Sequence, residues 1–597
     1  MRGSRAAIGT ARTGADVETR RIFLYLALGL ILILIWVNWR SDHAPKPLKA
    51  APAAATSVAA NGAGAPAATN PQTTSESAKS PELSASAAPA TGTHMRPAKL
   101  QAPGGTRIRI HTNVLVLNLA LDGATLTRAN LLKYPLKLHS KKSVALLSTA
   151  PKDYRVAEPL LISEDLPQTL HYQAGKTRYQ LAPGAQTLSV PLSWKGDGVS
   201  VKRVFVFTRG SYAVRVKTTI TNSTGVKRFT PGLRLVGHNP ATGQHFWDHF
   251  FPKYWAYRGP SYYDGDYEKP SAASLSGKPL EKTFAGGWIA SVNQYFVAAA
   301  IPAAKRKAHY FGRAVGDSGY AVGYRLPPVK LAAGQSKTLR MKLYLGPKTQ
   351  GHLNQVAPGL SRTVDYGKAT IISVPIFWIL SHIEAVIGNW GWALILLVLL
   401  IKAVFYFPQR MSARSMAKMR KLQPRLKLLK ERYKDDKQKL SQATMKLYKE
   451  EGANPVSGCL PMLIQLPIFF GLFYVLINSA ELRLAPWVLW LQDLSAPDPL
   501  YILPILYALA MLVQFRLQPQ AGDNAQAKMM MVMPLGMAFL YAVFPSGLVL
   551  YYLLNTILNI LIQWQVNREL GVPLNLWPED LWPRKKKTLP AKRESGE

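Results

Sequence analysis

A lysine interrupts an apolar run that is otherwise typical of a membrane helix. Lys402 follows the apolar stretch 392–401 and lies about six residues before the run ends at Pro408. With a rise of 1.5 Å per residue, its ammonium lies roughly 9 Å inside the membrane boundary. A charge at this depth costs about 3 kcal/mol, so the side chain either snorkels to the headgroups or faces a wet, functional cavity. Polar residues in other segments favour the cavity.

The last apolar segment carries a seam of polar side chains. They recur at intervals of three and four residues: Tyr552, Asn555, Thr556, Asn559 and Gln563. A helix places such residues on one face, and this face must meet protein or water because it is costly against lipid. The seam either forms hydrogen bonds between helices or, with Gln465 and Lys402, lines a hydrophilic pocket in the inner half of the membrane.

The segment before the seam is rich in methionine. Its methionines are Met529, Met530, Met531, Met533 and Met537. Methionine is unbranched and polarizable, so such a surface accepts many apolar partners. A polar pocket beside an adaptable apolar wall suits an unfolded chain that is about to become a membrane helix. The alternative is ordinary packing against lipid or the core.

Patterns typical of enzymes are weak. Four residues with the composition of a metal site lie in a region of alternating apolar and polar residues: His238, His245, Asp248 and His249. The histidines four residues apart would need a helix to converge. Asp264-Gly-Asp266 resembles the start of a calcium loop but lacks the later glutamate. The sequence has no phosphate-binding glycine loop and no credible nucleophile elbow. We therefore expect neither an enzyme nor a metal or other cofactor.

Apolar residues form 48% of the chain and are clumped, while charged residues form 18%. Apolar runs of about 20 residues indicate membrane spans. The first run, 22–39, ends in an aromatic anchor rather than a cleavage site, so we interpret it as an uncleaved span with a cytoplasmic N-terminus. The single cysteine, Cys459, excludes an intrachain disulfide framework. The net charge of +40 is spread along the chain without a nucleic-acid motif, so we expect no DNA partner.

From about residue 107 to 345 apolar and polar residues alternate, with Gly, Asn or Pro at the breaks. This pattern predicts a large all-β domain, a sandwich, on the periplasmic side. The region is strongly basic, with 34 Lys/Arg and 12 Asp/Glu between Arg107 and Lys342. We hypothesise an acidic periplasm or an anionic partner surface as the reason.

A second basic region has helical spacing. Residues 410–451 hold 14 Lys/Arg and 5 Asp/Glu, which predicts a cytoplasmic helical hairpin. Because the N-terminus is also cytoplasmic, an even number of spans separates the two, and the Pro375-broken segment 371–387 lies on the periplasmic surface. The hairpin is either a solvated loop that obeys the charge rule or a surface for the ribosome or lipid. The basic cluster 584–587 suits anionic lipid or ribosomal RNA.

These patterns predict a polytopic α-helical membrane protein with six spans and a large all-β periplasmic domain. The predicted order is a cytoplasmic N-terminus (1–21), first transmembrane helix (22–40), flexible linker (41–105), periplasmic β-sandwich (106–346), periplasmic connector with an interfacial helix (347–388), second transmembrane helix (389–408), cytoplasmic hairpin (409–457), third transmembrane helix (458–478), periplasmic loop (479–499), fourth transmembrane helix (500–517), cytoplasmic loop (518–527), fifth and sixth transmembrane helices (528–544 and 545–567) and a basic cytoplasmic tail (568–597).

Several stretches resemble one known family. Residues 286–302, 415–425, 435–443, 454–469 and 544–552 closely resemble, in this order, the YidC/Oxa-type membrane protein insertases in their Gram-negative form. The resemblance runs from the first span to the basic tail, apart from the linker. It implies a non-enzymatic insertase and chaperone of the bacterial inner membrane, with both termini cytoplasmic and residues 41–388 periplasmic.

The resemblance also implies site residues and partners. Lys402 stands where the family usually has an arginine, in a positively charged groove open to cytoplasm and lipid, and Val398 stands where members may carry a client-contacting threonine. Tyr552 matches the client-facing tyrosine, with Tyr551 beside it, and we add Gln465, Met533 and Met537 as client contacts. The β-domain resembles the family's β-supersandwich. The expected partners are nascent membrane proteins, the Sec translocon, the ribosome and anionic lipids, and the expected action occurs alone or with the Sec translocon.

Two other classes of function are open to the sequence. A small-solute transporter would show internal repeats, and the spans show no repeated halves. A tethered periplasmic binding protein or enzyme needs only one span as an anchor, which leaves the polar seams unexplained.

Overall fold

The computed structural model describes residues 104–572, apart from 239–255, 304–305, 317, 435, 454–459, 518–533 and 535. The described residues all belong to one compact unit, Thr93–Glu597. Several predictions therefore lie outside the described residues: the first span (22–40), the linker up to residue 103, the tail from residue 573, His245, Asp248, His249, Met529, Met530, Met531 and Met533.

The larger of two sheets has 11 strands, and its main path runs β14–β17–β18–β11–β5–β3–β2–β1–β7, with β19 paired to β11 and β4 to β3. Its strands are β1 (Arg107–His111), β2 (Leu115–Ala120), β3 (Thr125–Pro135), β4 (Ser143–Leu147), β5 (Arg155–Ile162), β7 (Arg178–Gln180), β11 (Lys227–His238), β14 (Leu280–Ala285), β17 (Lys307–Val315), β18 (Gly319–Arg325) and β19 (Val329–Leu331). The β1–β7 pair is parallel.

The second sheet has nine strands in the order β13–β12–β15–β16–β20–β10–β9–β8–β6, and every neighbouring pair is antiparallel. Its strands are β6 (Gln173–Ala174), β8 (Thr187–Gly196), β9 (Val199–Thr208), β10 (Ala213–Asn222), β12 (Gly259–Tyr263), β13 (Tyr267–Glu268), β15 (Trp288–Val292), β16 (Phe296–Ile301) and β20 (Ser336–Pro347). The short elements η1 (Pro151–Asp153) and α2 (Ala272–Gly277) lie between strands.

The two sheets share one hydrophobic core because their strands alternate buried and exposed side chains. On β10, Val214 and Val216 are buried while Arg215 and Lys217 are exposed. Val216 belongs to the same core as Leu117 of β2, which is a strand of the other sheet. The predicted large β-sheet domain is therefore confirmed.

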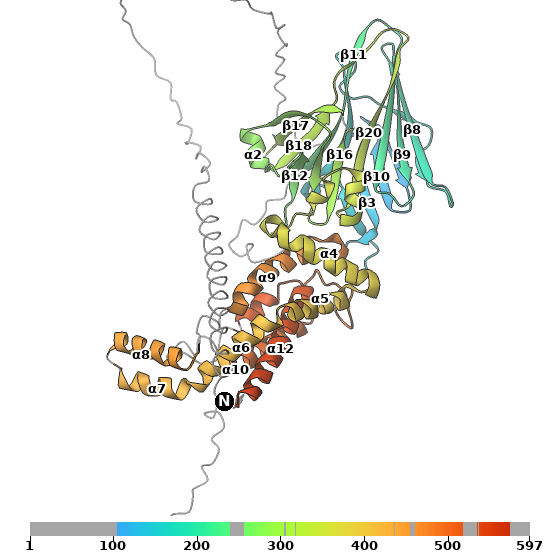
Figure 1. The fold of residues 1–597 in the computed structure, drawn as a ribbon. Coiled ribbons are helices and arrows are strands. Elements are labelled where there is room, and N and C mark those ends of the chain that lie inside the picture. Colours follow the sequence, from blue (N-terminus) through green and yellow to red (C-terminus); the bar gives the residue numbers. More distant parts are fainter. Residues whose placement is uncertain are drawn as a thin grey trace, which may run out of the picture. The chain divides into compact units, whose positions relative to one another are not determined.

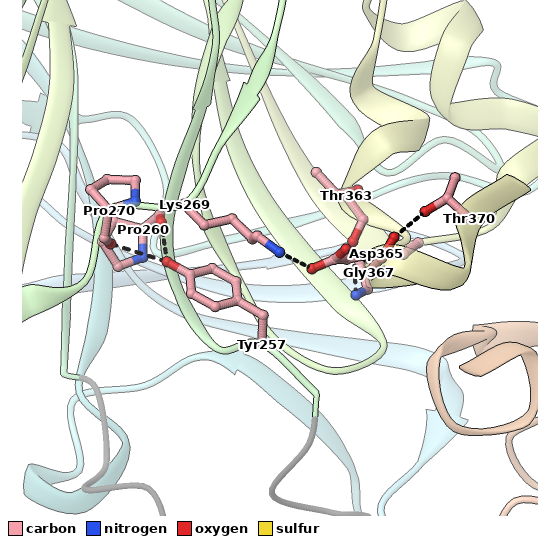
Figure 2. A network of polar contacts seen from close by, with 9 residues as sticks. Tyr257, Pro260, Lys269, Pro270, Thr363, Asp365, Gly367 and Thr370 are labelled. Atoms are coloured by element: carbon pink, nitrogen blue, oxygen red, sulfur yellow. Dashed lines mark hydrogen bonds and ion pairs between the residues drawn. The ribbon is translucent and has the colours of Figure 1, made fainter. Parts of the chain in front are cut away.

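A connector follows β20. It consists of α3 (Gln350–Val356), η4 (Leu360–Thr363) and η5 (Gly367–Ala369). Polar contacts fasten it to the β-domain: Lys269 forms an ion pair with Asp365, whose other oxygen accepts a 2.9 Å hydrogen bond from the Gly367 N–H (Figure 2). Thr370 Oγ1 then donates to the Gly367 carbonyl at 2.6 Å.

A buried lysine lies at the start of this connector. Lys348 is 2% exposed, and its Nζ donates a 3.0 Å hydrogen bond to the Thr363 carbonyl. Nearby, Gln350 N donates a 3.0 Å hydrogen bond to Oε1 of Glu481, which belongs to η7 (Ala480–Leu482) and lies 131 residues further along the chain. This junction therefore joins the β-domain, the connector and the helical bundle.

The helical part follows the connector (Figure 1). Its helices are α4 (Thr370–Ile387), α5 (Trp390–Val404), α6 (Tyr406–Lys421), α7 (Gln423–Arg432), α8 (Lys437–Glu450), α9 (Leu460–Asn478), α10 (Ile502–Leu517) and α12 (Ser546–Glu569). Gly388, in the left-handed conformation, ends α4, and the Asn389 side chain caps α5 by accepting from Gly391 N at 2.9 Å.

Among the described residues, α4 and α12 are long and apolar enough to cross a membrane. The pair α5–α6 adds a third candidate if it counts as one bent span, and residues 463–478 and 502–517 form shorter apolar helices. The structure thus contains a few apolar spans, whereas the predicted count of six stays a prediction.

The second predicted span is not one straight helix to Pro408. The chain breaks at Phe405, and α6 departs from α5 at 67°. Proline has no N–H, so Pro408 cannot donate to the carbonyl of Val404 four residues earlier, which is where the bend lies. Lys402 consequently lies in the last turn of α5, directly before a sharp bend.

Candidate functional site

Lys402 belongs to α5, and its side chain contacts α6 and α12. The side chain is 6% exposed, and its Nζ donates a 2.6 Å hydrogen bond to Asn559 Oδ1 of α12 and a 3.2 Å hydrogen bond to Gln409 Oε1 of α6. Both partners are neutral amide oxygens, so they orient the ammonium without neutralising its charge. The bend after Val404 brings Gln409 back toward Lys402.

A cavity of about 580 Å³ opens beside this lysine, and we call it the Lys402 groove. Its lining residues are Lys402, Ala403, Tyr406, Leu558, Leu561, Ile562, Trp564 and Gln565. Apart from the lysine and Gln565, the lining is apolar or aromatic. Leu561 and Trp564 are about half exposed, at 52% and 45%. The groove thus combines a cation with an apolar wall.

The polar seam of α12 runs from the bundle core to the Lys402 groove. Asn555 and Thr556 are buried, and Asn559 receives the lysine. Gln563, one turn further, donates to Asn567 Oδ1 at 3.1 Å and to the Ala413 carbonyl of α6 at 3.4 Å. Each of the two interpretations of the seam applies to part of it, because Asn559 holds the charge while Gln563 joins two helices.

Tyr552 lies in an aromatic cluster deeper in the bundle. Its ring centroid is 5.0 Å from that of Tyr541, 5.5 Å from that of Phe469 and 5.9 Å from that of Tyr507. Tyr551 is 1% exposed and its hydroxyl receives a hydrogen bond from Gln465 Nε2 of α9. The cluster therefore ties α9, α10 and α12 together.

The remaining predicted contacts do not line the groove. Val398 is 1% exposed and packs in the bundle core on α5. Met537 is partly buried against the same core. Met533 lies outside the described residues. The structure thus brings Lys402 and Asn559 together at the groove, and places Val398, Tyr551 and Tyr552 inside the bundle.

Sequence reasoning missed Gln409 and Tyr406. Gln409 belongs to α6, and the bend at Phe405 brings it to Lys402, so the contact depends on a break that the predicted straight span did not include. Reasoning also missed the ion pairs of Glu569 with Arg410 at 2.8 Å and Arg414 at 3.3 Å, which fasten α6 to the end of α12. Nothing in the local pattern of Glu569 indicates partners over 150 residues away.

The possible metal ligands of the β-domain have other partners. His238 is within hydrogen-bond distance of Ser318, Asp264 pairs with Lys282 at 2.8 Å, and Asp266 lies 3.8 Å from Arg362. Within the described part of the chain, no group of three or more His, Cys, Asp or Glu residues is arranged to hold a metal ion.

Apolar helices that hold a buried cation beside a groove, joined to a large β-sheet domain, define a membrane protein with an extramembrane domain. The family model "60Kd inner membrane protein" matches residues 382–572, and "YidC periplasmic domain" matches residues 107–379. The membrane protein insertase YidC of Thioalkalivibrio sulfidiphilus is 37% identical over 93% of this chain and 99% of its own length. That of Methylobacillus flagellatus is 39% identical over 92% and 97%.

A solved structure described as an active YidC insertase with the first transmembrane domain resolved has 18% identity over 78% of this chain and 93% of its own, with a TM-score of 0.35. The chain belongs to the YidC family of membrane protein insertases. It is accordingly a multi-pass inner-membrane protein with a periplasmic β-domain, and insertion rather than enzymatic catalysis is its function.

Proposed function

We propose that this insertase takes client segments through the Lys402 groove. The observation that carries the proposal is the buried lysine itself, which is held by two neutral amide oxygens beside an apolar cavity. An uncompensated cation attracts the short, often acidic flank of a client, and the wall formed by Leu558, Leu561 and Trp564 accepts its apolar segment. The groove, open to cytoplasm and lipid, thereby accommodates both the acidic flank and the apolar segment of the client.

A short hydrophobic path lowers the barrier that the client's polar flank meets. With 15 residues, α5 is about 22 Å long, less than the ~30 Å hydrocarbon thickness of a bilayer. The client helix then moves into lipid, driven by burial of about 20 apolar residues, so the hydrophobic effect supplies the work. No nucleotide, metal or other cofactor takes part.

Client contact with the inner residues requires the bundle to open. Val398 and Tyr551 are buried, and the partly buried Tyr552 packs against Tyr507, Tyr541 and Phe469. We infer that the client first meets Leu561 and Trp564, and that contact with Val398, Tyr551, Tyr552 and Gln465 follows when α9 and α10 move away from α12. We propose Met533 and Met537 as further adaptable apolar contacts of the client, and Met537 is partly buried against the bundle core.

The proposed topology has six spans, a five-helix insertase core, cytoplasmic termini and a periplasmic β-supersandwich. The basic helices α6 to α8 support it, because they must lie on the same side as the basic N-terminus. This parity leaves α4 in the periplasmic interface, although its length and composition would also allow it to cross.

We propose the Sec translocon, the ribosome and anionic lipids as partners, with insertion occurring alone or with the Sec translocon. Exposed cations on α7 and α8 support a ribosomal or lipid contact of the hairpin. Arg425, for example, pairs with Glu451 at 2.6 Å, whereas Lys427 and Lys430 point into solvent.

Site-specific photocrosslinking tests the route. A photoreactive residue replaces Leu561 in the groove, Tyr552 in the cluster, or Leu509 on α10, which is equally exposed at 54% but does not line the groove. The target is a ribosome-stalled single-span client of increasing length. We expect crosslinks first at position 561, then at 552, and few at 509. Equal crosslinking at 561 and 509 at every length would refute the groove as the path.

A further inference from the structure

The outer face of the nine-stranded sheet carries an unusual block of cations. Alternation along β8, β9, β10 and β20, which lie side by side in Figure 1, places six basic side chains on this face. They are Lys195, Lys202, Arg215, Lys217, Arg340 and Lys342. All are exposed except Lys342, which is partly buried and donates to the Val356 carbonyl at 2.9 Å. We call this surface the basic face.

The strand register places like charges opposite one another. Arg215 is paired with Lys342, and Lys217 with Arg340, on adjacent antiparallel strands. Directly opposite side chains lie about 5 Å apart, and like charges there destabilise a sheet. The arrangement therefore opposes folding stability, so a purely structural role does not account for it.

Among the residues that the structure describes, no acidic side chain forms an ion pair with the basic face, unlike cations elsewhere in the β-domain. The strands β8, β9, β10 and β20 contain no aspartate or glutamate. In the other sheet, by contrast, Arg234 pairs with Glu158 at 2.5 Å and Arg313 with Glu281 at 3.1 Å. General basicity of the chain does not explain this separation, because acids are available nearby in the fold.

The connector covers a different part of the same sheet. Outward residues of β15 and β16, such as Ala290 and Ala299, are buried in the cluster that contains Leu353 and Leu360 of the connector. On the basic face, Val204 and Val206 are only partly buried, between the cations of β10 and the exposed Pro191 and Ser189 of β8. The face therefore offers positive charge around a small apolar strip.

We propose that the basic face binds an extended acidic polypeptide segment. Arg215 and Lys217 are two residues apart on one strand, and so are Arg340 and Lys342 on the next, a repeat of roughly 6.8 Å. An extended peptide that runs along the strands presents every second side chain with the same repeat. Alternate carboxylates would then meet successive cations, while small apolar side chains contact Val204 and Val206.

A flat sheet face of this kind suits a peptide better than a bilayer. Membrane-surface binding combines attraction to anionic lipids with apolar side chains that enter the interface, and the outward residues of these four strands are short, polar or cationic except for Val204, Val206, Pro191 and the buried Tyr344. The acidic segment that we propose for this face is the translocated flank of a client, which the charge rule leaves poor in Lys and Arg.

The first experiment measures peptide binding to the full-length chain in nanodiscs. The probe is a fluorescent 12-residue peptide in which Asp alternates with Ser. The test variant is Arg215→Ser/Lys217→Ser/Arg340→Ser. The matched control is Arg107→Ser/Arg109→Ser/Arg178→Ser, which removes the same charge, including a cross-strand pair, from exposed positions of β1 and β7.

We expect the test variant to weaken binding at least tenfold and the control less than twofold, with affinity falling as salt rises. Equal weakening by both variants would mean that binding depends only on the net charge of the protein, which would overturn the proposal. The proposal would also be overturned if the peptide did not bind while vesicles rich in phosphatidylglycerol bound in a way that depended on the basic face. A peptide with the same Asp residues in one block should bind more weakly, and equal affinity contradicts the register argument.

A second experiment identifies the occupant. A photocrosslinker at Val204 in cells should capture a stalled client with an acidic translocated flank, and this crosslink should be lost in the test variant. Capture of a resident periplasmic protein and not of the client would overturn the client flank as the occupant. Crosslinks that persist in the test variant overturn the proposal. Insertion through the groove is read independently at position 561 in the same cells, so failure of one proposal is distinguishable from failure of the other.

Discussion

Two lysines are buried among the described residues, and their surroundings differ. Lys402 is 6% exposed, meets side-chain amides of Asn559 and Gln409, and borders a cavity of about 580 Å³. Lys348 is 2% exposed, donates to one backbone carbonyl, and is enclosed between the β-domain, the connector and η7. Burial alone therefore does not identify a functional cation. The cavity beside Lys402 gives its charge something to act on, whereas Lys348 acts only on the fold.

Reversal of the groove charge should give the largest effect. We expect Lys402→Glu to lower the insertion of a client with an acidic flank about 100-fold, roughly 3 kcal/mol, because attraction becomes repulsion. Lys402→Arg should retain most activity. The measurement is protease protection of the translocated flank in cells depleted of the native insertase. Lys137→Glu, the same reversal at an exposed site of the β-domain, is the control. Comparable losses at 137 and 402 would remove the special status of the groove.

Removal of the other buried charge should change stability rather than insertion. Burial lowers the pKa of Lys348 from 10.5 to about 7, partly offset by Asp365 and Glu481 and reinforced by Lys269. Below pH 7 both the folded and the unfolded state are protonated, so burying the charge costs the full amount, about 5 kcal/mol. Lys348→Met should therefore stabilise the junction by about 2 kcal/mol at pH 6, after loss of the hydrogen bond to Thr363.

The sign of this effect has a defined pH window. Between about pH 7 and pH 10.5 the unfolded state keeps a proton that the folded state has lost, so the wild-type chain gains stability as pH rises. The advantage of Lys348→Met should shrink across this window. Hydrogen exchange of peptides from residues 342–366 in the full-length chain measures it. An advantage independent of pH, or a tenfold loss of insertion, contradicts the structural role of Lys348.

Loss of the lysine's nearest partner should have a smaller effect than loss of the charge. We expect Asn559→Ala to lower insertion about fivefold, close to 1 kcal/mol, because the ammonium loses its 2.6 Å hydrogen bond but keeps that to Gln409. The comparison variant is Asn555→Ala, one turn earlier on the same helix and also buried. A stronger effect at 555 than at 559 would mean that the seam acts mainly by joining helices.

The sequence predicted the features that repeat along the chain and missed those that depend on distant partners. Alternation identified the β-domain, and a cation in an apolar run identified Lys402. Pro408 indicates a bend near Phe405, but the apolar run around it is also compatible with one unbroken helix. Lys348 and Glu481 each lie in unremarkable polar sequence. Their burial results from contacts such as that between Gln350 and Glu481, which are 131 residues apart, and no local pattern encodes that distance.

The prediction with the smallest expected effect asks whether Glu481 compensates the charge of the buried Lys348. Burial raises the pKa of Glu481, while the hydrogen bond from Gln350 N and the charge of Lys348 oppose this rise. A raised acid pKa means that stability is full at low pH and falls as pH rises through the folded-state pKa. Glu481→Gln should therefore match the wild-type chain near pH 4 and exceed its junction stability at pH 8. Hydrogen exchange of the same peptides measures this difference.

The same substitution in the Lys348→Met chain sharpens the comparison of the two lysines. In the Lys348→Met chain the Glu481 carboxylate has lost its compensating cation. Near pH 6, where Lys348 of the wild-type chain is still largely protonated, Glu481→Gln should therefore stabilise the Lys348→Met chain more than it stabilises the wild-type chain. The difference between the two backgrounds should vanish above about pH 9, where Lys348 of the folded chain is neutral. A double-mutant cycle with no coupling at pH 6 would mean that Lys348 and Glu481 are buried independently, and that neither compensates the charge of the other.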